Sequence, residues 1–360
     1  IREVRKIIKE HPNMNIMSVS QNDNRNYCEC ENCSRVDAEE GSPSGLMVRF
    51  ANAIAEAISD EHPDVFIHTF AYQYTEKPPR ITKPHQKVVL MLCPIGCCQY
   101  HRYDNCSHNA AFMNNLKQWS SLTNQLYIWH YNANLRHYLA PFPDLRQLTH
   151  SLKLYHKHHV KGLIAQGMEP GGRGFMDELK AYLIAKLLWD ASLDSERIKQ
   201  EFLQGYFGNA ASPINQFLEL LHDKVENDNT HGYFSEGIDV IIQPHRLYAD
   251  GETPHFMTKE IIVESRRLFE EARASVTDPA IHKRLEQAEF SLDYLEHMRA
   301  VYRAQDSNEA EKAKALGGIR ALAERSRTLG YHEWSSGPPG TMERRLNEIE
   351  AKLTKQKWKQ

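Results

Sequence analysis

Short apolar runs alternate with helical patterns over the first half of the chain. Five of these runs are typical of β-strands, at residues 15–20, 65–72, 87–93, 126–130 and 161–166. Between them, apolar residues recur every three or four positions, which predicts helices over 44–59, 109–122 and 145–158. This alternation predicts an α/β fold whose parallel strands form part of a TIM-type (β/α) barrel.

After Gly174 the pattern is helical only. It predicts helices over residues 175–189, 195–207, 213–224, 258–274, 278–304, 309–329 and 341–357. We therefore predict a partial barrel domain over 1–175 and an all-helical C-terminal domain over 176–360. A complete barrel has eight strands, but only about five are predicted here, and the chain begins with a helical pattern at 1–10 rather than with Met. We expect the barrel to be N-terminally incomplete, with three β/α units and any export signal upstream.

Charge and composition narrow the classes of partner. The 360 residues include 44 Lys and Arg against 47 Asp and Glu, for a net charge of −3. Without a basic excess, nucleic acid is not the expected partner. No apolar run approaches the length of about 18 residues that a membrane span needs, so no span is expected. The oligomeric state stays open.

Candidate chemistry follows the predicted strands, because functional groups of parallel α/β folds gather beyond the C-terminal strand ends. Asp23 and Glu169 are the acids that we place near such ends. Polar and aromatic residues there form a candidate sugar site: Tyr72, Tyr74, His101, Arg102, Trp129, Tyr131, Asn132 and Asn134. Glycoside hydrolysis uses two carboxyl groups, so we predict Asp23 as general acid and Glu169 as base or nucleophile. In the competing interpretation Asp23 is a turn or helix-cap residue and Glu169 a solvated loop acid.

Seven cysteines fall into two groups. The first is Cys28-x-Cys30-x-x-Cys33, which with one further ligand could close a tetrahedral zinc site. The second is Cys93, Cys97, Cys98 and Cys106, accompanied by His101 and His108. Three interpretations stay open: a structural metal at Cys28, Cys30 and Cys33, disulfides in an exported protein, or free thiols that pack as small hydrophobes.

Several blocks in order resemble the bacterial domain of unknown function 4838 over about residues 10–220. They are Val19-Ser20-Gln21-Asn22-Asp23, Tyr27-Cys28-x-Cys30-x-x-Cys33, Pro43-Ser44-Gly45, Cys93-Pro94-Ile95-x-Cys97-Cys98, Ile128-Trp129-x-Tyr131 and Leu183-x-x-Lys186-Leu187-Leu188-Trp189-Asp190. The resemblance implies a glycoside hydrolase-like barrel in an exported protein of polysaccharide-degrading bacteria.

A fainter similarity links the chain to the xylan α-glucuronidases, and it places Asp23 at the position of their acid catalyst. Two strand ends that carry further carboxylates in those enzymes here carry Gly96-Cys97-Cys98 and Asn132-Ala133-Asn134, without an acid. That departure puts glucuronidase activity by their mechanism in doubt.

Together these patterns predict hydrolysis of a glycosidic bond in a complex oligo- or polysaccharide. The catalysis requires no cofactor, although a structural zinc is compatible with the cysteines. Arg102 and Arg173 near strand ends favour an acidic sugar. The alternatives are a non-catalytic carbohydrate-binding protein on the same scaffold and a zinc-stapled interaction protein.

Overall fold

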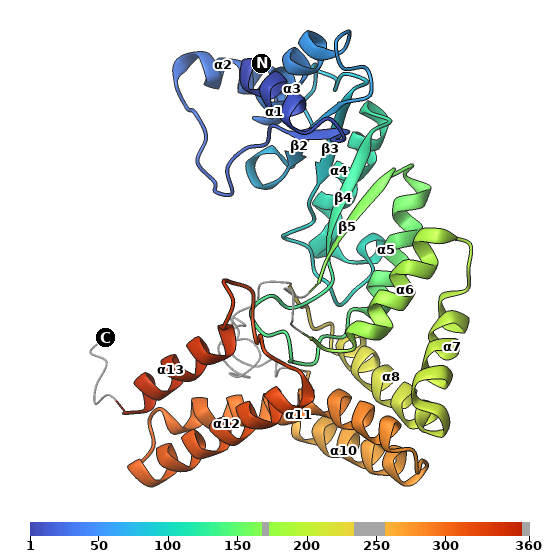
Figure 1. Ribbon diagram of the computed structural model, residues 1–360, viewed down its shortest axis with the longest axis vertical. Helices are drawn as coiled ribbons and strands as arrows, with labels where there is room; N and C mark the ends of the chain where they lie inside the picture. The colour runs from blue at the N-terminus through green and yellow to red at the C-terminus, as the bar shows by residue number, and fades with distance from the viewer. Residues whose placement is uncertain (168–172, 234–255, 355–360) are drawn as a thin grey trace. The chain divides into compact units, whose positions relative to one another are not determined.

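The computed structural model describes residues 1–167, 173–233 and 256–354 (Figure 1). These residues divide into two compact units. The first comprises residues 1–97, 103–131 and 153–166, and it contains the β-sheet. The second comprises residues 98–102, 132–152 and the described part of 167–360, and it is mainly helical.

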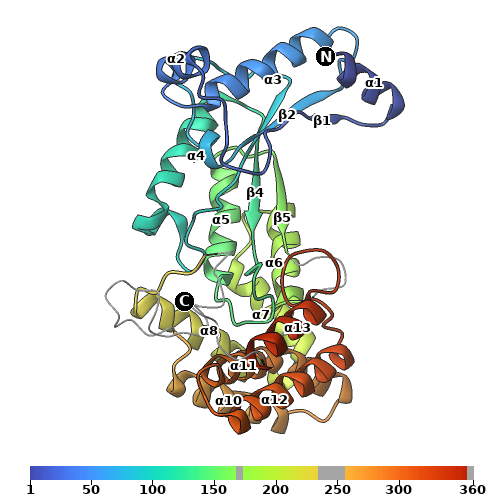
Figure 2. The same ribbon diagram turned by 90° about the vertical axis from the view of Figure 1, so that its left-hand side faces the viewer.

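The first unit is built on a curled sheet of five parallel strands (Figure 2). In both sequence and spatial order these are β1 (Ile16–Ser18), β2 (Phe66–Ala71), β3 (Val88–Leu92), β4 (Leu126–Tyr131) and β5 (Gly162–Gln166). All five predicted strands are confirmed, with ends that differ by at most two residues. The fold is thus a parallel half-barrel with helices between its strands.

Burial differs between the central and the edge strands. Every residue of β3 is buried, because β3 pairs with a strand on each side and both of its faces are covered. By contrast, Ile16 on β1 and Ile164 on β5 are 42% and 41% exposed. Within the described residues each of these two edge strands pairs on one side only.

Helices before and between the strands cover the sheet. Apolar residues of α1 (Arg2–Glu10) and α3 (Ser44–Ile58) form one buried cluster with Ile67 of β2 and Val88 of β3. The predicted helices also appear as α4 (Ala110–Leu122) and α5 (Leu145–Lys157).

Sequence periodicity missed α2 (Glu31–Glu40), and the reason is physical. The one buried residue of α2 is the charged Glu40, so this helix has no apolar stripe to detect.

The Glu40 carboxylate joins the end of α2 to the segment that follows β2. It accepts hydrogen bonds from the backbone N–H groups of Ile81 and Thr82 at 3.0 and 3.1 Å, from the Thr82 hydroxyl, and from Arg49 Nη2 at 2.5 Å. The Glu40 side chain is fully buried. Burial opposes the charged form, but the hydrogen bonds from Thr82, Ile81 and Arg49 prevail and lower the pKa of Glu40 to about 2.

We expect Glu40→Ala to lower the free energy of unfolding of the first unit by about 2–4 kcal/mol, because several charge-assisted hydrogen bonds are lost. Since the folded pKa lies below the ordinary value of 4.5, this contribution is complete above about pH 4.5 and disappears as the pH falls towards 2. Hydrogen–deuterium exchange of residues 31–82 measures the effect. Glu39→Ala, at the exposed neighbouring position, is the control, and an equal loss in both variants would refute the prediction.

The second unit contains seven described helices that follow the predicted ones closely. They are α6 (Asp177–Trp189), α7 (Ser195–Phe207), α8 (Ala211–Asn227), α10 (Lys259–Ala274), α11 (Pro279–Ala304), α12 (Glu309–Leu329) and α13 (Thr341–Thr354). Side-chain caps start four of them, at Asp194, Thr258, Asp278 and Asn308. The predicted end of the last helix, 355–357, lies outside the described residues. Among the helices that are described, none is long and apolar enough to cross a membrane.

Candidate active site

Parallel pairing brings the ends of β1 and β2 together. Ser18 of β1 is in register with His68 of β2, so the chain leaves both strands at the same edge of the sheet. Asp23 follows β1, and Tyr72 directly follows β2. The Tyr72 hydroxyl donates a hydrogen bond of 3.0 Å to Asp23 Oδ1. The structure therefore joins two of the predicted site residues.

Polar contacts hold these two strand ends in place. Gln21 Nε2 donates to the Tyr72 carbonyl at 2.8 Å, and the Thr75 hydroxyl donates to Gln21 Oε1 at 2.7 Å. The Tyr72 N–H donates in turn to Thr75 Oγ1 at 3.0 Å. Between them Gln73 adopts a left-handed conformation with φ of 53°, which is unusual for a residue other than glycine. The loop that presents Tyr72 is thus tightly constrained.

Burial, with a contribution from the Asp23 carboxylate, raises the pKa of Tyr72 to about 12. The hydroxyl therefore stays protonated at neutral pH and keeps donating to Asp23. Because Asp23 is exposed to solvent while this donor is half-buried, the carboxylate is oriented from the protein side and open on the other.

Aromatic rings also occur on β4 and on the segments that follow β1 and β2. Tyr74, two residues after Tyr72, stacks on the 42% exposed Tyr27 with ring centroids 4.8 Å apart. Trp129 of β4 packs edge-on against Phe70 of β2 at 5.8 Å. Such rings offer the flat apolar surfaces on which sugar rings stack.

The Trp129 indole is oriented by the neighbouring strand. Its Nε1–H donates to Gln166 Oε1 at the end of β5, at 2.7 Å. The indole nitrogen is therefore engaged by the protein, and the half-buried ring face is what Trp129 offers to a ligand.

Glu76, which the strand pattern did not identify, is a second carboxyl group near these strand ends. It follows the short 3₁₀ helix Gln73–Thr75 and is half-buried. Burial raises its pKa, and a 3.2 Å hydrogen bond from Asn115 Nδ2 on α4 partly opposes that shift. The Trp119 indole also donates to the Glu76 carbonyl at 2.8 Å, which anchors the backbone. The available signal was the position of Glu76 five residues beyond β2.

Tyr131, at the end of β4, is within electrostatic reach of both carboxyl groups. It is 5% exposed, and burial is the main reason why its pKa is raised. Electrostatic interactions with Cys93, Tyr72, Asp23 and Glu76 add to the shift. The segments at the ends of the first four strands therefore place two carboxyl groups and Tyr72 within electrostatic reach of the same buried tyrosine.

The sequence matches the family described as domain of unknown function DUF4838 over residues 1–219, which is more than half of the chain. The protein belongs to the DUF4838 family. No curated protein matches the chain at a significant level. The DUF4838 match includes all five strands and α6 and α7, so the candidate site lies within it.

Other predicted site residues of the DUF4838 region belong to the second unit. Asn134 Oδ1 accepts from the backbone N–H groups of Arg136 and His137, at 3.0 and 3.3 Å, and so shapes its own loop. The Asn132 carbonyl accepts from Lys180 Nζ at 3.0 Å. Arg102 is exposed, and His101 lies next to Cys98. The predicted catalytic Glu169 lies outside the described residues.

The cysteine motif of the DUF4838 region brings its three sulfur atoms together. The Sγ atoms of Cys28, Cys30 and Cys33 lie within 4.8 Å of one another, around the N-terminus of α2. The Cys33 N–H and the neighbouring thiols lower the pKa of Cys30, while hydrogen bonds to Cys28 and Cys30 raise that of Cys33 to about 12. All seven cysteines lie in described residues, and no disulfide joins them. Three sulfur donors this close together, none of them fully buried, fit three of the four positions of the predicted metal site.

Proposed function

We propose that this DUF4838 protein cleaves a glycosidic bond in a complex glycan by a two-carboxylate mechanism, on a half-barrel that forms part of a TIM-type barrel. The observation that carries the proposal is the Asp23 carboxylate beyond the C-terminal ends of β1 and β2. The Tyr72 hydroxyl orients this carboxylate through a hydrogen bond of 3.0 Å. Glycoside hydrolysis needs such an oriented carboxylate together with a second, protonated carboxyl group. Because a protein that cleaves polysaccharides must reach them, we also propose that this protein is exported.

The surroundings of the two described carboxyl groups suit different roles. Burial raises the pKa of Glu76, which favours the protonated form that a general acid needs. Asp23 is exposed and accepts a hydrogen bond, as a base or nucleophile does. We therefore propose Glu76 as the acid and Asp23 as the base or nucleophile, in place of the sequence-based assignment of Asp23 as acid. The sequence-based assignment of Glu169 as base or nucleophile stays the alternative to Asp23 in that role.

The aromatic side chains would bind the sugar rings. The stacked pair Tyr27 and Tyr74 includes the 42% exposed Tyr27 ring, and the half-buried Trp129 offers a second ring. Stacking on such faces binds a pyranose without requiring a particular charge. Arg102, which follows β3 in the sequence, favours an acidic sugar among the substrates to be tried.

A panel of aryl glycosides, including glucuronides, and of plant and host polysaccharides tests the proposal on the intact protein. We expect turnover of at least one substrate and a loss of about 10²-fold or more in Asp23→Asn. Tyr72→Phe removes the donor to Asp23 alone and should reduce turnover less. Glu56→Gln on α3, an exposed acid of this unit, is the matched control.

Two outcomes would contradict the proposal, the first for hydrolysis itself and the second for the role of Asp23. Glycan affinity without turnover would establish the non-catalytic carbohydrate-binding alternative, which isothermal titration calorimetry with the same polysaccharides detects. Equal turnover by the original protein and by Asp23→Asn would show that Asp23 does not take part.

A further inference from the structure

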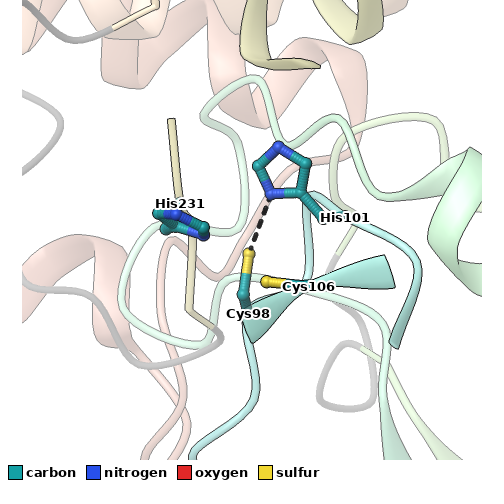
Figure 3. A group of neighbouring side chains, drawn as sticks. All are labelled: Cys98, His101, Cys106 and His231. Carbon is teal, nitrogen blue, oxygen red and sulfur yellow. Dashed lines mark hydrogen bonds between the residues drawn. The ribbon is translucent and has the colours of Figure 1, made fainter. Parts of the chain in front are cut away.

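Two cysteines and two histidines form a second cluster, separate from Cys28, Cys30 and Cys33 (Figure 3). Cys98, His101 and Cys106 come from one nine-residue loop after β3, and His231 comes from the segment after α8. One donor atom from each of the four residues lies within 4.8 Å of the others. Cys98 is fully buried and Cys106 is 8% exposed, so the sulfur atoms point inward rather than to solvent.

Backbone contacts hold the distant segment beside the loop. The Gln99 N–H, next to Cys98, donates a 2.6 Å hydrogen bond to the carbonyl of Gly232, next to His231. A side chain at Gly232 would overlap the Tyr100 ring, so only glycine allows this close approach. The placement of His231 is therefore built into the packing.

The Tyr100 ring makes that packing rigid. It is 2% exposed and meets the rings of Phe142 and Phe256 edge-on, with centroids 5.3 and 5.5 Å apart. Because Tyr100 lies between Cys98 and His101 in the loop, a fixed Tyr100 also fixes the backbone that carries these two donors. The cluster is thus supported by an aromatic core rather than by a surface loop.

The distances within the cluster approach those of a tetrahedral metal site. Cys98 Sγ lies 3.4 Å from His101 Nδ1, and the rings of His101 and His231 have centroids 4.9 Å apart. Zinc bound at its usual bond lengths separates sulfur and nitrogen ligands by about 3.3–3.8 Å. The four donor atoms, which all lie within 4.8 Å of one another, are therefore close to these separations.

The donor types select the metal. Two thiolates and two imidazoles suit Zn²⁺, whereas Ca²⁺ and Mg²⁺ require oxygen ligands. The two thiols would lose their protons on binding, and their two negative charges would neutralise the ion in its buried position. Four protein ligands leave no open position for water, which is typical of structural rather than catalytic zinc.

We infer that Cys98, His101, Cys106 and His231 bind one Zn²⁺ ion as a structural Cys₂His₂ centre. The ion ties the loop after β3 to the segment after α8, two segments that are far apart in the sequence. Such a cross-link stabilises the folded chain because it restricts the unfolded one. This site is independent of the proposed hydrolysis and of the Cys28, Cys30 and Cys33 motif.

Zinc content per chain, measured by elemental analysis of the purified intact protein, tests the inference. We expect one zinc equivalent that Cys98→Ser and Cys106→Ser each remove. The matched control is Cys97→Ser, which changes the adjacent buried cysteine and should keep the ion. The triple variant Cys28→Ser/Cys30→Ser/Cys33→Ser should also keep this equivalent, so a second zinc at that motif would be counted separately.

Ligand exchange keeps the test decisive if a serine variant does not fold. His231→Cys replaces one zinc ligand by another and should retain the metal, whereas His231→Ala should lose it. Replacement of zinc by Co²⁺ in the intact protein should produce the absorption of tetrahedral cobalt with thiolate ligands. A protein purified without zinc that gives no such spectrum with Co²⁺ would overturn the inference, as would unchanged zinc in both Cys98→Ser and Cys106→Ser.

Discussion

Glu76→Gln is expected to lower kcat on an unactivated glycan by about 10²–10⁴-fold, the usual contribution of a general acid. The substitution keeps the size of the side chain and its acceptor for the 3.2 Å hydrogen bond from Asn115, so the fold should persist. What it removes is the proton that the leaving oxygen needs. Because burial raises the pKa of Glu76, the original protein should lose activity on the alkaline side as this group deprotonates.

The leaving group separates catalysis by Glu76 from a structural role. When the substrate is an aryl glycoside of a strongly acidic phenol, the phenolate leaves without being protonated. Glu76→Gln should therefore lose far less activity on this substrate than on the glycan. The alkaline limb of the pH profile should also disappear in this variant. Glu56→Gln is again the control. Equal losses on both classes of substrate, with an unchanged pH profile, would mean that Glu76 only supports the fold.

Lys180→Met is expected to lower the free energy of unfolding by about 3–5 kcal/mol, because it leaves a buried carboxylate without its partner. Lys180 and Asp144 are each 1% exposed, with Nζ and Oδ1 2.9 Å apart. The ammonium also donates to the Asn132 carbonyl at 3.0 Å and lies 5.3 Å from the centroid of the Phe142 ring. Methionine keeps most of the length of the lysine side chain but makes none of these polar contacts.

The pH dependence of this loss has a definite sign. Burial raises the pKa values of Asp144 and Asp177 to about 6, and the Lys180 charge holds them below where burial alone would put them. For such groups the folded state is favoured below the ordinary pKa of 3.8, and this advantage is lost as the pH rises through 6. Without Lys180 the two acids must stay protonated or be buried as bare charges. The destabilisation should therefore be larger at about pH 7.5 than at about pH 5.

Urea denaturation at the two pH values measures this effect. Lys186→Met on the same helix, where the lysine pairs with Glu201 at the surface, should cost no more than about 0.5 kcal/mol. Adding Asp144→Asn to Lys180→Met should recover part of the loss, since it removes the uncompensated charge. A cost for Lys180→Met no larger than that for Lys186→Met would refute the prediction.

Periodicity was sufficient for nearly all of the described elements. The apolar run at Val88–Leu92 and the stripes of α3 and α6 reflect burial against a neighbour, and that burial imposes its spacing on the sequence. Among the described α-helices the exception was α2, which is anchored by the charge of Glu40 instead of by an apolar face. A helix held by one buried carboxylate leaves no periodic signal.

The candidate site could be predicted where it depends on strand ends. Asp23, Tyr72, Trp129 and Tyr131 all follow or end strands that the pattern located, and parallel pairing brings such ends to one edge. Glu76 was missed because it follows the 3₁₀ helix Gln73–Thr75 rather than coming directly after β2. The pKa of Glu76 depends on its burial, and burial of a loop residue has no local pattern.

Zinc ligation shows most clearly the limit of local sequence patterns. Cys98, His101 and Cys106 are visible as a group in the chain, but their fourth partner is more than a hundred residues away. Spacing along the chain determined the strands, most helices and the residues at strand ends, because these depend on contacts with near neighbours. The tertiary structure alone decided that His231 meets Cys98 and that Lys180 meets Asp144, because packing brings together side chains that share no periodic relation.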